Sequence, residues 1–173
     1  MYDKNCQLCT LSKNRTQIVW GSGSKNAQIM FIGEAPGRKE DEGGLPFIGA
    51  AGKILDEFLA RAQLNRNDIY ITNIVKCRPP NNRNPKPDEI YACAKYLLHQ
   101  IETIQPRVII TLGSFATQAI LGTDTPISQL HNKPQQYGNY TVLPLYHPAA
   151  TIYNQQLRPQ FINSANTLRD LIK

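Results

Sequence analysis

Four short, mostly apolar runs divide the chain, and segments with helical periodicity lie between them. Short runs of this kind are typical of strands that are buried on both faces of a sheet. The four runs cover residues 29–32, 69–75, 107–112 and 140–146. We therefore expect these runs to be the central strands of the protein.

The segments between the runs show the apolar period of helices. Ile54, Leu55, Phe58, Leu59 and Ala62 recur at a spacing that places them on one helical face. The expected helices cover residues 54–62, 88–104, 113–121 and 158–172. Strands that alternate with helices predict an α/β fold, here a three-layer α/β/α arrangement around a central four-stranded, mainly parallel sheet. The length of 173 residues suits one domain, residues 1–173.

Glycine and proline mark the segments that we expect to be irregular. Gly33 and Gly37 enclose Glu34, Ala35 and Pro36, so the first strand should end there in a sharp turn. Residues 43–49 are rich in Gly and Pro, and residues 78–87 hold four prolines and three asparagines. Neither segment is suited to a helix or a central strand.

The chain is basic overall, which favours a polyanionic partner such as nucleic acid. It has 19 Lys and Arg against 13 Asp and Glu, a formal net charge of +6 and a pI near 9.2. A basic cytosolic protein without such a partner is the alternative. The sequence has no apolar run of ~18 residues that would span a membrane, and its first residues lack the layout of a signal peptide. We therefore expect a cytoplasmic protein, in which disulfides are rare.

Four cysteines then need an explanation other than disulfides. Cys6 and Cys9 form a Cys-x-x-Cys pair, whereas Cys77 and Cys93 are separated by fifteen residues. Sets of four thiolates bind zinc or an iron–sulfur cluster. Zinc sites usually pair two closely spaced motifs, so the wide second spacing favours iron–sulfur over zinc. The alternative for Cys93 is a buried core thiol, because it shares helical spacing with Leu97.

Polar side chains stand at or near the ends of three predicted strands, namely Glu34, Asn73 and His147. The carboxyl ends of parallel strands meet at one edge, so we expect these side chains to share a crevice. The Asn73 amide offers a donor beside an acceptor, which matches the N3–H and O4 edge of uracil and mismatches cytosine. His147 can donate to a carbonyl oxygen that gains negative charge, and Phe47 can stack on a flat base. The alternatives are a loop cap for Asn73, a turn residue for His147 and a core residue for Phe47.

Four motifs together resemble one family. They are Gly-Glu-Ala-Pro-Gly at 33–37 followed by Glu40 and Asp41, Leu-Pro-Phe-Ile-Gly-x-Ala-Gly at 45–52, Thr-Asn-x-Val-Lys-Cys at 72–77, and Tyr-His-Pro-Ala-Ala at 146–150. As a set they resemble the family 4 uracil-DNA glycosylases, the iron–sulfur type of bacteria and archaea. The resemblance runs over nearly the whole chain.

The resemblance implies a hydrolase of base excision repair. Such an enzyme flips uracil out of DNA and hydrolyses its N-glycosidic bond, which releases uracil and leaves an abasic site without lyase activity. Phe47 would stack on the flipped base, and Asn73 would bind its N3–H and O4 edge. His147 would hydrogen-bond O2 and stabilise the uracil anion as it leaves.

The resemblance also implies roles for the loop after the first strand. Backbone groups around Glu34 and Ala35 would line the pocket, and Glu40 would shape its wall against the methyl group of thymine. Glu34 would position the attacking water or balance the positive charge on the sugar. The chain departs from its relatives at two positions. Ala35 stands where the best-studied glycosylases carry Asp, and Tyr153 stands near where many relatives carry Arg.

All four cysteines fall where the family places the ligands of a structural [4Fe-4S] cluster, which would hold the N-terminal segment against the loop before the Cys93 helix. The implied partner is uracil-containing DNA, and the implied protein is a monomer in the cytoplasm, at the nucleoid. No signal for a replication-clamp contact is readable. Relatives that crosslink to DNA use a histidine that residues 78–87 lack. The alternative function is a non-catalytic nucleic-acid-binding module with a structural four-cysteine metal site. No Gly-x-Gly-x-x-Gly or P-loop supports nucleotide binding.

Overall fold

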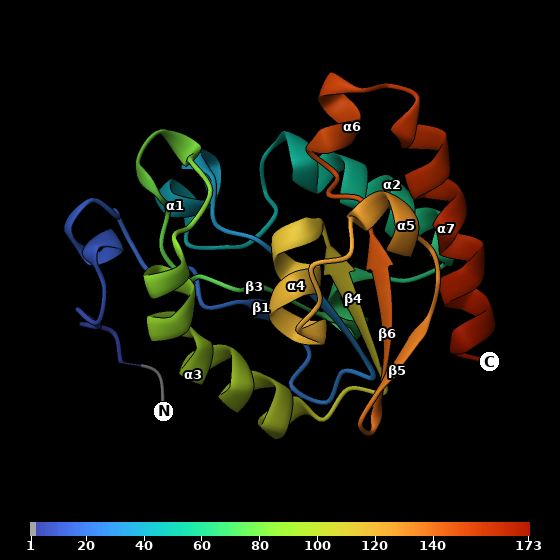
Figure 1. Cartoon of the computed structure of the whole chain (residues 1–173), viewed down its shortest axis with the longest axis horizontal. Coiled ribbons are helices and arrows are strands. Elements are labelled where there is room, and N and C mark those ends of the chain that lie inside the picture. The colour runs from blue at the N-terminus through green and yellow to red at the C-terminus, as the bar shows by residue number, and fades with distance from the viewer. Residues whose placement is uncertain (1–2) are drawn as a thin grey trace.

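A six-stranded mixed sheet forms the centre of the protein, as seen in a computed structural model that describes residues 3–173 (Figure 1). The strand order is β1-β3-β2-β4-β6-β5. The strands are β1 (Ser22–Gly23), β2 (Ile29–Gly33), β3 (Tyr70–Asn73), β4 (Val108–Leu112), β5 (Gln135–Tyr137) and β6 (Tyr140–Leu145).

The four central strands are parallel, and they are the four that the apolar runs predict. Gly33 of β2 pairs with Asn73 of β3, and Leu112 of β4 pairs with Leu145 of β6. Every residue of β2, β3 and β4 is buried, as a sheet covered on both faces requires. The antiparallel edge strands β1 and β5 were not predicted, because both are very short and mostly polar.

Helices cover both faces of the sheet, so the predicted three-layer α/β/α fold is confirmed. Side chains of a strand alternate between faces, and β2 shows this with Phe31 on one side and Met30 and Ile32 on the other. Phe31 packs with α2 (Ala50–Ala62) and α7 (Leu157–Leu171). Met30 and Ile32 pack with α3 (Pro87–Ile104) and α4 (Ser114–Leu121). None of the helices described is both long and apolar enough to cross a bilayer.

Short helices occupy segments that the sequence predicted as loops. They are α1 (Arg38–Gly43), α5 (Ile127–Leu130), α6 (Ala150–Tyr153) and the 3₁₀ turns η1 (Thr10–Lys13), η2 (Arg66–Asp68) and η3 (Pro80–Asn82). None is long enough to show an apolar period. The predicted strand 69–75 also ends early, at Asn73. The amides of Ile74 and Val75 still bond the carbonyls of Gly33 and Glu34, but residues 74–77 form bends rather than a regular strand.

The N-terminal segment packs on the outside of this core rather than within the sheet. In Figure 1 it lies beside the start of α3 and the loop that precedes it. The buried side chains of Leu11, Val75 and Tyr96 form a separate small apolar cluster with Cys77 and Cys93. This cluster brings the two pairs of cysteines together.

Candidate active site and cysteine cavity

A cleft of about 420 Å³ opens at the carboxyl ends of the central strands. Its size is within the usual range for small-molecule sites, about 300–1,000 Å³. All the residues predicted to bind substrate or act on it line the cleft, namely Glu34, Ala35, Glu40, Phe47, Asn73 and His147. Further lining residues come from the proline-rich loop and from α6, and they include Pro79, Asn82, Arg83, Asn84 and Tyr153. The expected convergence therefore occurs, while the individual roles stay predictions.

Asn73 presents an unsatisfied hydrogen-bond acceptor in this cleft. It is the last residue of β3, its exposed fraction is 2%, and its buried Oδ1 has no partner among the described residues. A buried carbonyl oxygen without a donor is unfavourable, so the site is arranged for a ligand N–H. Gly33 leaves the room that this needs, because a Cβ there would lie 2.4 Å from Asn73 Oδ1 and 2.6 Å from Phe47 Cζ.

His147 is held as a neutral donor. The backbone N–H of Ala149 donates to its Nδ1 at 3.1 Å, so the ring proton of the neutral form is on Nε2. Burial lowers the pKa of His147 to about 4, and the carboxylate of Glu40 opposes that shift. Gly113 gives the ring its space, since a Cβ at that glycine would lie 3.0 Å from His147 Cβ. At neutral pH His147 can donate a hydrogen bond without carrying a charge.

Phe47 belongs both to the core and to the cleft. Its exposed fraction is 5%, and its ring lies 5.8 Å from that of His147 at an interplanar angle of 29°. Its φ of 54° is unusual for a residue other than glycine, and such backbone strain collects at functional sites. Arg66 holds this conformation by donating from Nη2 to the Phe47 carbonyl at 2.6 Å. Asp56 in turn accepts from Arg66 Nε at 2.6 Å.

The two carboxylates at the cleft have different surroundings. Glu40 Oε1 accepts the backbone N–H groups of Ile48 and Gly49 at 2.9 and 2.7 Å, so it braces the loop that follows Phe47. Glu34 is half-buried, and burial raises its pKa. A carboxylate with a raised pKa is a better proton acceptor, so Glu34 suits an interaction with water.

The proline-rich loop is fixed by a buried carboxylate. Glu89, near the start of α3, accepts two hydrogen bonds from Arg83, at 2.8 and 2.6 Å, and one from the Lys86 N–H at 2.8 Å. It also accepts from Thr10 Oγ1 at 3.0 Å, which attaches the N-terminal segment. Arg83 lowers the pKa of Glu89 to about 2. Because Arg83 is already paired with this carboxylate, its charge is less available to a phosphate group.

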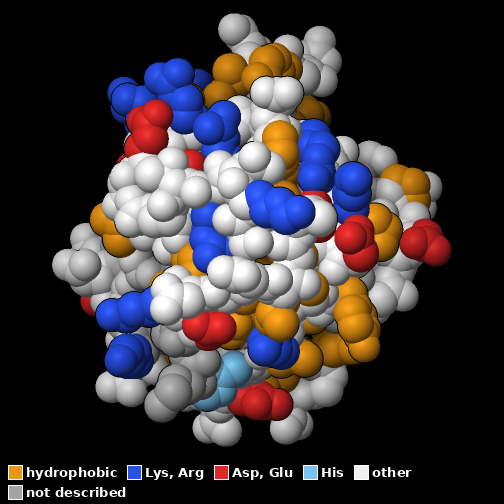
Figure 2. Space-filling view, turned by 90° about the vertical axis from the view of Figure 1, so that its left-hand side faces the viewer, with side chains coloured by type: hydrophobic (Ala, Val, Ile, Leu, Met, Phe, Trp, Pro, Cys, Tyr) orange, Lys and Arg blue, Asp and Glu red, His pale blue; other side chains and the backbone are white. Residues whose placement is uncertain are grey.

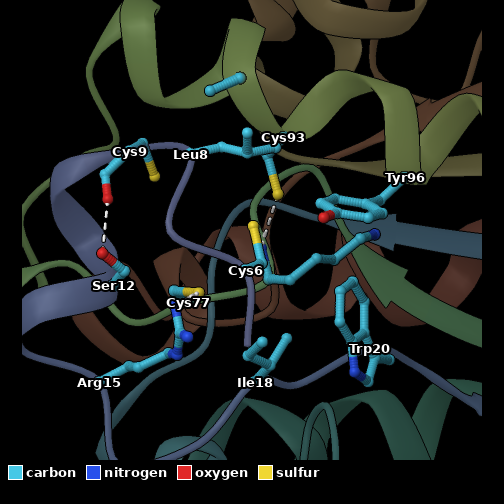
Figure 3. A pocket seen from close by; sticks show the side chains of 12 residues that line it. Cys6, Leu8, Cys9, Ser12, Arg15, Ile18, Trp20, Cys77, Cys93 and Tyr96 are labelled. Atoms are coloured by element: carbon cyan, nitrogen blue, oxygen red, sulfur yellow. Dashed lines mark hydrogen bonds between the residues drawn. The ribbon is translucent and has the colours of Figure 1, made fainter. Parts of the chain in front are cut away.

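The four cysteine side chains surround a second, smaller cavity. Figure 3 shows the sulfurs of Cys6, Cys9, Cys77 and Cys93 around a common space. Burial raises the pKa of Cys77 to about 11 and also raises the pKa values of Cys9 and Cys93. The sulfurs of Cys77 and Cys93 each accept a hydrogen bond. The amide of Lys76 donates to Cys93 Sγ at 3.3 Å, and Arg15 Nη1 donates to Cys77 Sγ at 3.5 Å.

The four cysteines are a donor set of the kind that holds zinc or an iron–sulfur cluster. Zinc requires its sulfur ligands about 2.3 Å from one point. No group of three or more Cys, His, Asp or Glu within residues 3–173 is arranged to hold one metal ion. A [4Fe-4S] cluster is larger and is ligated by four separate thiolates, which this cavity can supply.

Sequence reasoning missed three residues that support the site, namely Arg66, Lys76 and Glu89. Glu89 had a signal, because it is the third residue of a helix that begins with proline, where a carboxylate often caps the helix. Lys76 also had one, since it is a charge in the apolar stretch that leads to Cys77. Arg66 had none, because its partners lie ten or more residues away.

Comparisons with known proteins find similar sequences in one family. The family model described as the uracil DNA glycosylase superfamily matches residues 20–169. The chain is 45% identical to the type-4 uracil-DNA glycosylase of Archaeoglobus fulgidus, with 96% of this chain and 88% of that protein covered. It is 46% identical to that of Saccharolobus solfataricus, with coverage of 90% and 76%. The type-4 enzyme of Thermotoga maritima is 41% identical, with coverage of 98% and 91%.

The lowered pKa of His147 predicts its behaviour on titration. The ring should stay neutral between about pH 5.5 and 8, because its pKa in the folded protein is about 4 against about 6.5 for a free histidine. Between about pH 6.5 and about pH 4 the unfolded chain binds a proton at this residue and the folded chain does not, so this residue destabilises the fold as the pH falls through that window. NMR of the ring Cε1–H measures this, with the signal assigned from its loss in His147→Gln. A midpoint near 6.5 would contradict the prediction.

Proposed function

Because the chain belongs to the uracil DNA glycosylase superfamily, and within it to the type-4 enzymes, we propose that it is a hydrolase that excises uracil from DNA. The reaction cleaves the N-glycosidic bond, releases free uracil and leaves an abasic site without strand cleavage. The unpartnered Oδ1 of Asn73, beside Phe47 and a neutral His147, is the observation that carries this proposal.

Base recognition follows from the hydrogen-bonding groups of the cleft. A uracil extruded from the duplex offers N3–H to Asn73 Oδ1 and accepts from the Asn73 amide at O4. Cytosine has an acceptor at N3 and would leave Oδ1 without a donor. A mismatched polar group in a buried site gives strong discrimination. The ring of Phe47 supplies an apolar face against which the flat base packs.

Bond cleavage leaves negative charge on uracil and positive charge on the sugar. The Nε2–H of His147 is aimed at O2, where part of that negative charge develops, and a fixed donor there stabilises the transition state. A neutral donor suits this role because it needs no prior protonation at neutral pH. Glu34, with its raised pKa, positions the attacking water or balances the charge on the sugar. Ala35 has no polar side chain and contributes through its backbone.

DNA binding involves the surface around the cleft. Tyr153 is 90% exposed and Ile152 is 44% exposed at the end of α6, and both suit insertion beside the extruded nucleotide. The buried Thr151 instead bonds the Pro148 carbonyl at 2.8 Å. Figure 2 shows basic side chains spread over the face that carries the N-terminal segment, where they can contact phosphates. The proposed enzyme is a monomeric single domain that works in the cytoplasm, at the nucleoid.

The proposed resident group is a [4Fe-4S] cluster held by Cys6, Cys9, Cys77 and Cys93, with zinc as the less favoured occupant. When bound, it supplies a crosslink between segments rather than redox chemistry. Cys6 and Cys9 come from the N-terminal segment, Cys77 from the segment that follows β3, and Cys93 from α3. The N–H···S bonds from Lys76 and Arg15 are of the kind that stabilise thiolate ligands.

The first prediction on function concerns Asn73→Asp. The substitution removes the amide donor and adds a negative charge that faces O4, so uracil excision should fall about 10²-fold or more. A uracil-containing oligonucleotide followed by alkali treatment measures excision. Asn84→Asp is the matched control, since it makes the same change at an exposed position of the same cleft. Full activity in Asn73→Asp would refute the recognition role. Absence of excision by the wild-type protein would favour the non-catalytic binding module.

A second prediction separates catalysis from binding at His147. His147→Ala should lose about 10²–10³-fold in single-turnover rate, because one donor to the leaving group is removed. Its affinity for abasic-site DNA should change only a few-fold, since the developing charge is absent there. Fluorescence anisotropy with labelled abasic DNA measures the second quantity. An equal loss of rate and affinity would mean that His147 acts on the structure of the cleft.

The cluster gives a third prediction. Protein purified without oxygen should show a broad absorbance band in the visible blue, and Cys77→Ala should lose that band together with iron content. Ser12→Ala is the control, because Ser12 borders the same cavity without a thiol. Stoichiometric zinc with a colourless protein would overturn the iron–sulfur assignment.

A further inference from the structure

A lysine is buried between the cysteine cavity and the cleft. Lys76 has an exposed fraction of 1% and comes three residues after Asn73 and directly before Cys77. Its side chain lines the cysteine cavity. Burial of an ammonium group is unfavourable unless every donor finds an acceptor. The reaction proposed above uses no chemistry of this side chain, so its position needs a separate explanation.

Burial lowers the pKa of Lys76 to about 7, and its side-chain nitrogen makes three hydrogen bonds. Lys76 Nζ donates to the Asn73 backbone carbonyl at 2.6 Å, to Thr72 Oγ1 at 2.7 Å and to Gln100 Oε1 at 2.7 Å. A protonated lysine has three N–H donors, and these are three acceptors. Each acceptor is an uncharged oxygen, so the arrangement is a hydrogen-bonding junction and not an ion pair.

The side-chain partners of the ammonium are themselves anchored. Thr72 Oγ1 donates to the Trp20 carbonyl at 2.8 Å, and Gln100 Nε2 donates to the same carbonyl at 2.6 Å. Gln100 Nε2 also contacts the Tyr70 hydroxyl at 3.3 Å. Lys76 therefore joins β3, α3 and the N-terminal segment at one point. Such a fully satisfied buried network favours one rigid arrangement of its members.

We propose that Lys76 is the positioning residue for Asn73, through its hydrogen bond to the Asn73 carbonyl, and so links the cysteine cavity to base recognition. The proposal rests on the recognition role of Asn73 given above. Lys76 does not touch the base. It fixes the backbone of Asn73 where the chain leaves the sheet, and that backbone sets the direction of the amide side chain.

The geometry explains why such a support is needed. Asn73 ends β3, and the following residues form bends, so regular strand pairing does not continue beyond it. The backbone amide of Lys76 donates to Cys93 Sγ, which attaches the other end of this short segment to the cysteine cavity. A displacement of about 1 Å at a recognition group can lower the rate about 10²-fold.

A double-mutant cycle tests the proposal. Lys76→Met keeps an unbranched side chain, one atom shorter than lysine, and removes the three donors, so it should lower kcat/KM for uracil DNA about 10²-fold. In the Asn73→Ala background the same change should lower kcat/KM by no more than about twofold, because the group that Lys76 positions is already absent. Lys25→Met is the matched control, since Lys25 is exposed and precedes β2, at the end of the sheet away from the cleft. Equal losses in the two backgrounds would overturn the positioning role.

Stability is measured in parallel. Lys76→Met should lower the melting temperature similarly in both backgrounds, whereas only its effect on kcat/KM should depend on Asn73. If Lys76→Met does not fold, Lys76→Gln replaces it in the cycle. Glutamine keeps two N–H donors, so Lys76→Gln should lower kcat/KM by less than about 10²-fold. This loss in kcat/KM should again vanish in the Asn73→Ala background. A loss that persists there would overturn the proposal.

A structural measurement separates this proposal from the proposed function. Crystal structures of the wild type and of Lys76→Met are compared. In Lys76→Met, or in Lys76→Gln where it replaces that variant, the Asn73 amide should be displaced from its wild-type position in the cleft. An Asn73 that stays in place overturns the positioning role, even if the wild type excises uracil. A wild type without excision would overturn the proposed function. The crystal structures would then still decide whether Lys76 positions Asn73.

Discussion

The cleft depends on the close approach of the neighbouring parallel strands β2 and β3 at their carboxyl ends. Gly33 of β2 pairs with Asn73 of β3, and the space above Gly33 is filled by Asn73 Oδ1 and the ring of Phe47. Any larger residue at Gly33 would displace both. The ring of Phe47 reaches this point from a separate loop, where its backbone is left-handed and its carbonyl accepts a hydrogen bond from Arg66.

Much of the fold was predictable because it rests on local patterns. Each apolar run of the central sheet became a parallel strand, and the apolar face of residues 54–62 became the buried side of α2. The edge strands and α1 were not predictable in this way. Ser22–Gly23 is too short to show alternation, and Arg38–Gly43 has no apolar period, so tertiary contacts decide their structure.

The position of the site was predictable, but its supports were not. The rule that parallel strands present their carboxyl ends at one edge was sufficient to bring Glu34, Asn73 and His147 together. The Lys76 junction depends on Gln100, which is twenty-four residues away, and no spacing rule relates the two. The catalytic roles of the cleft residues remain predictions, because position alone does not measure a rate.

The two edges of the sheet have a consequence for the behaviour of the protein in solution. β1 has two residues and β5 has three, and both run antiparallel to their neighbours. An open edge with many unpaired backbone groups can recruit a strand from another molecule, which is a first step toward amyloid-like assembly. The short edge strands β1 and β5 offer few unpaired backbone groups. The parallel strands are longer than β1 and β5 and would be the better templates, but they lie between these two edge strands.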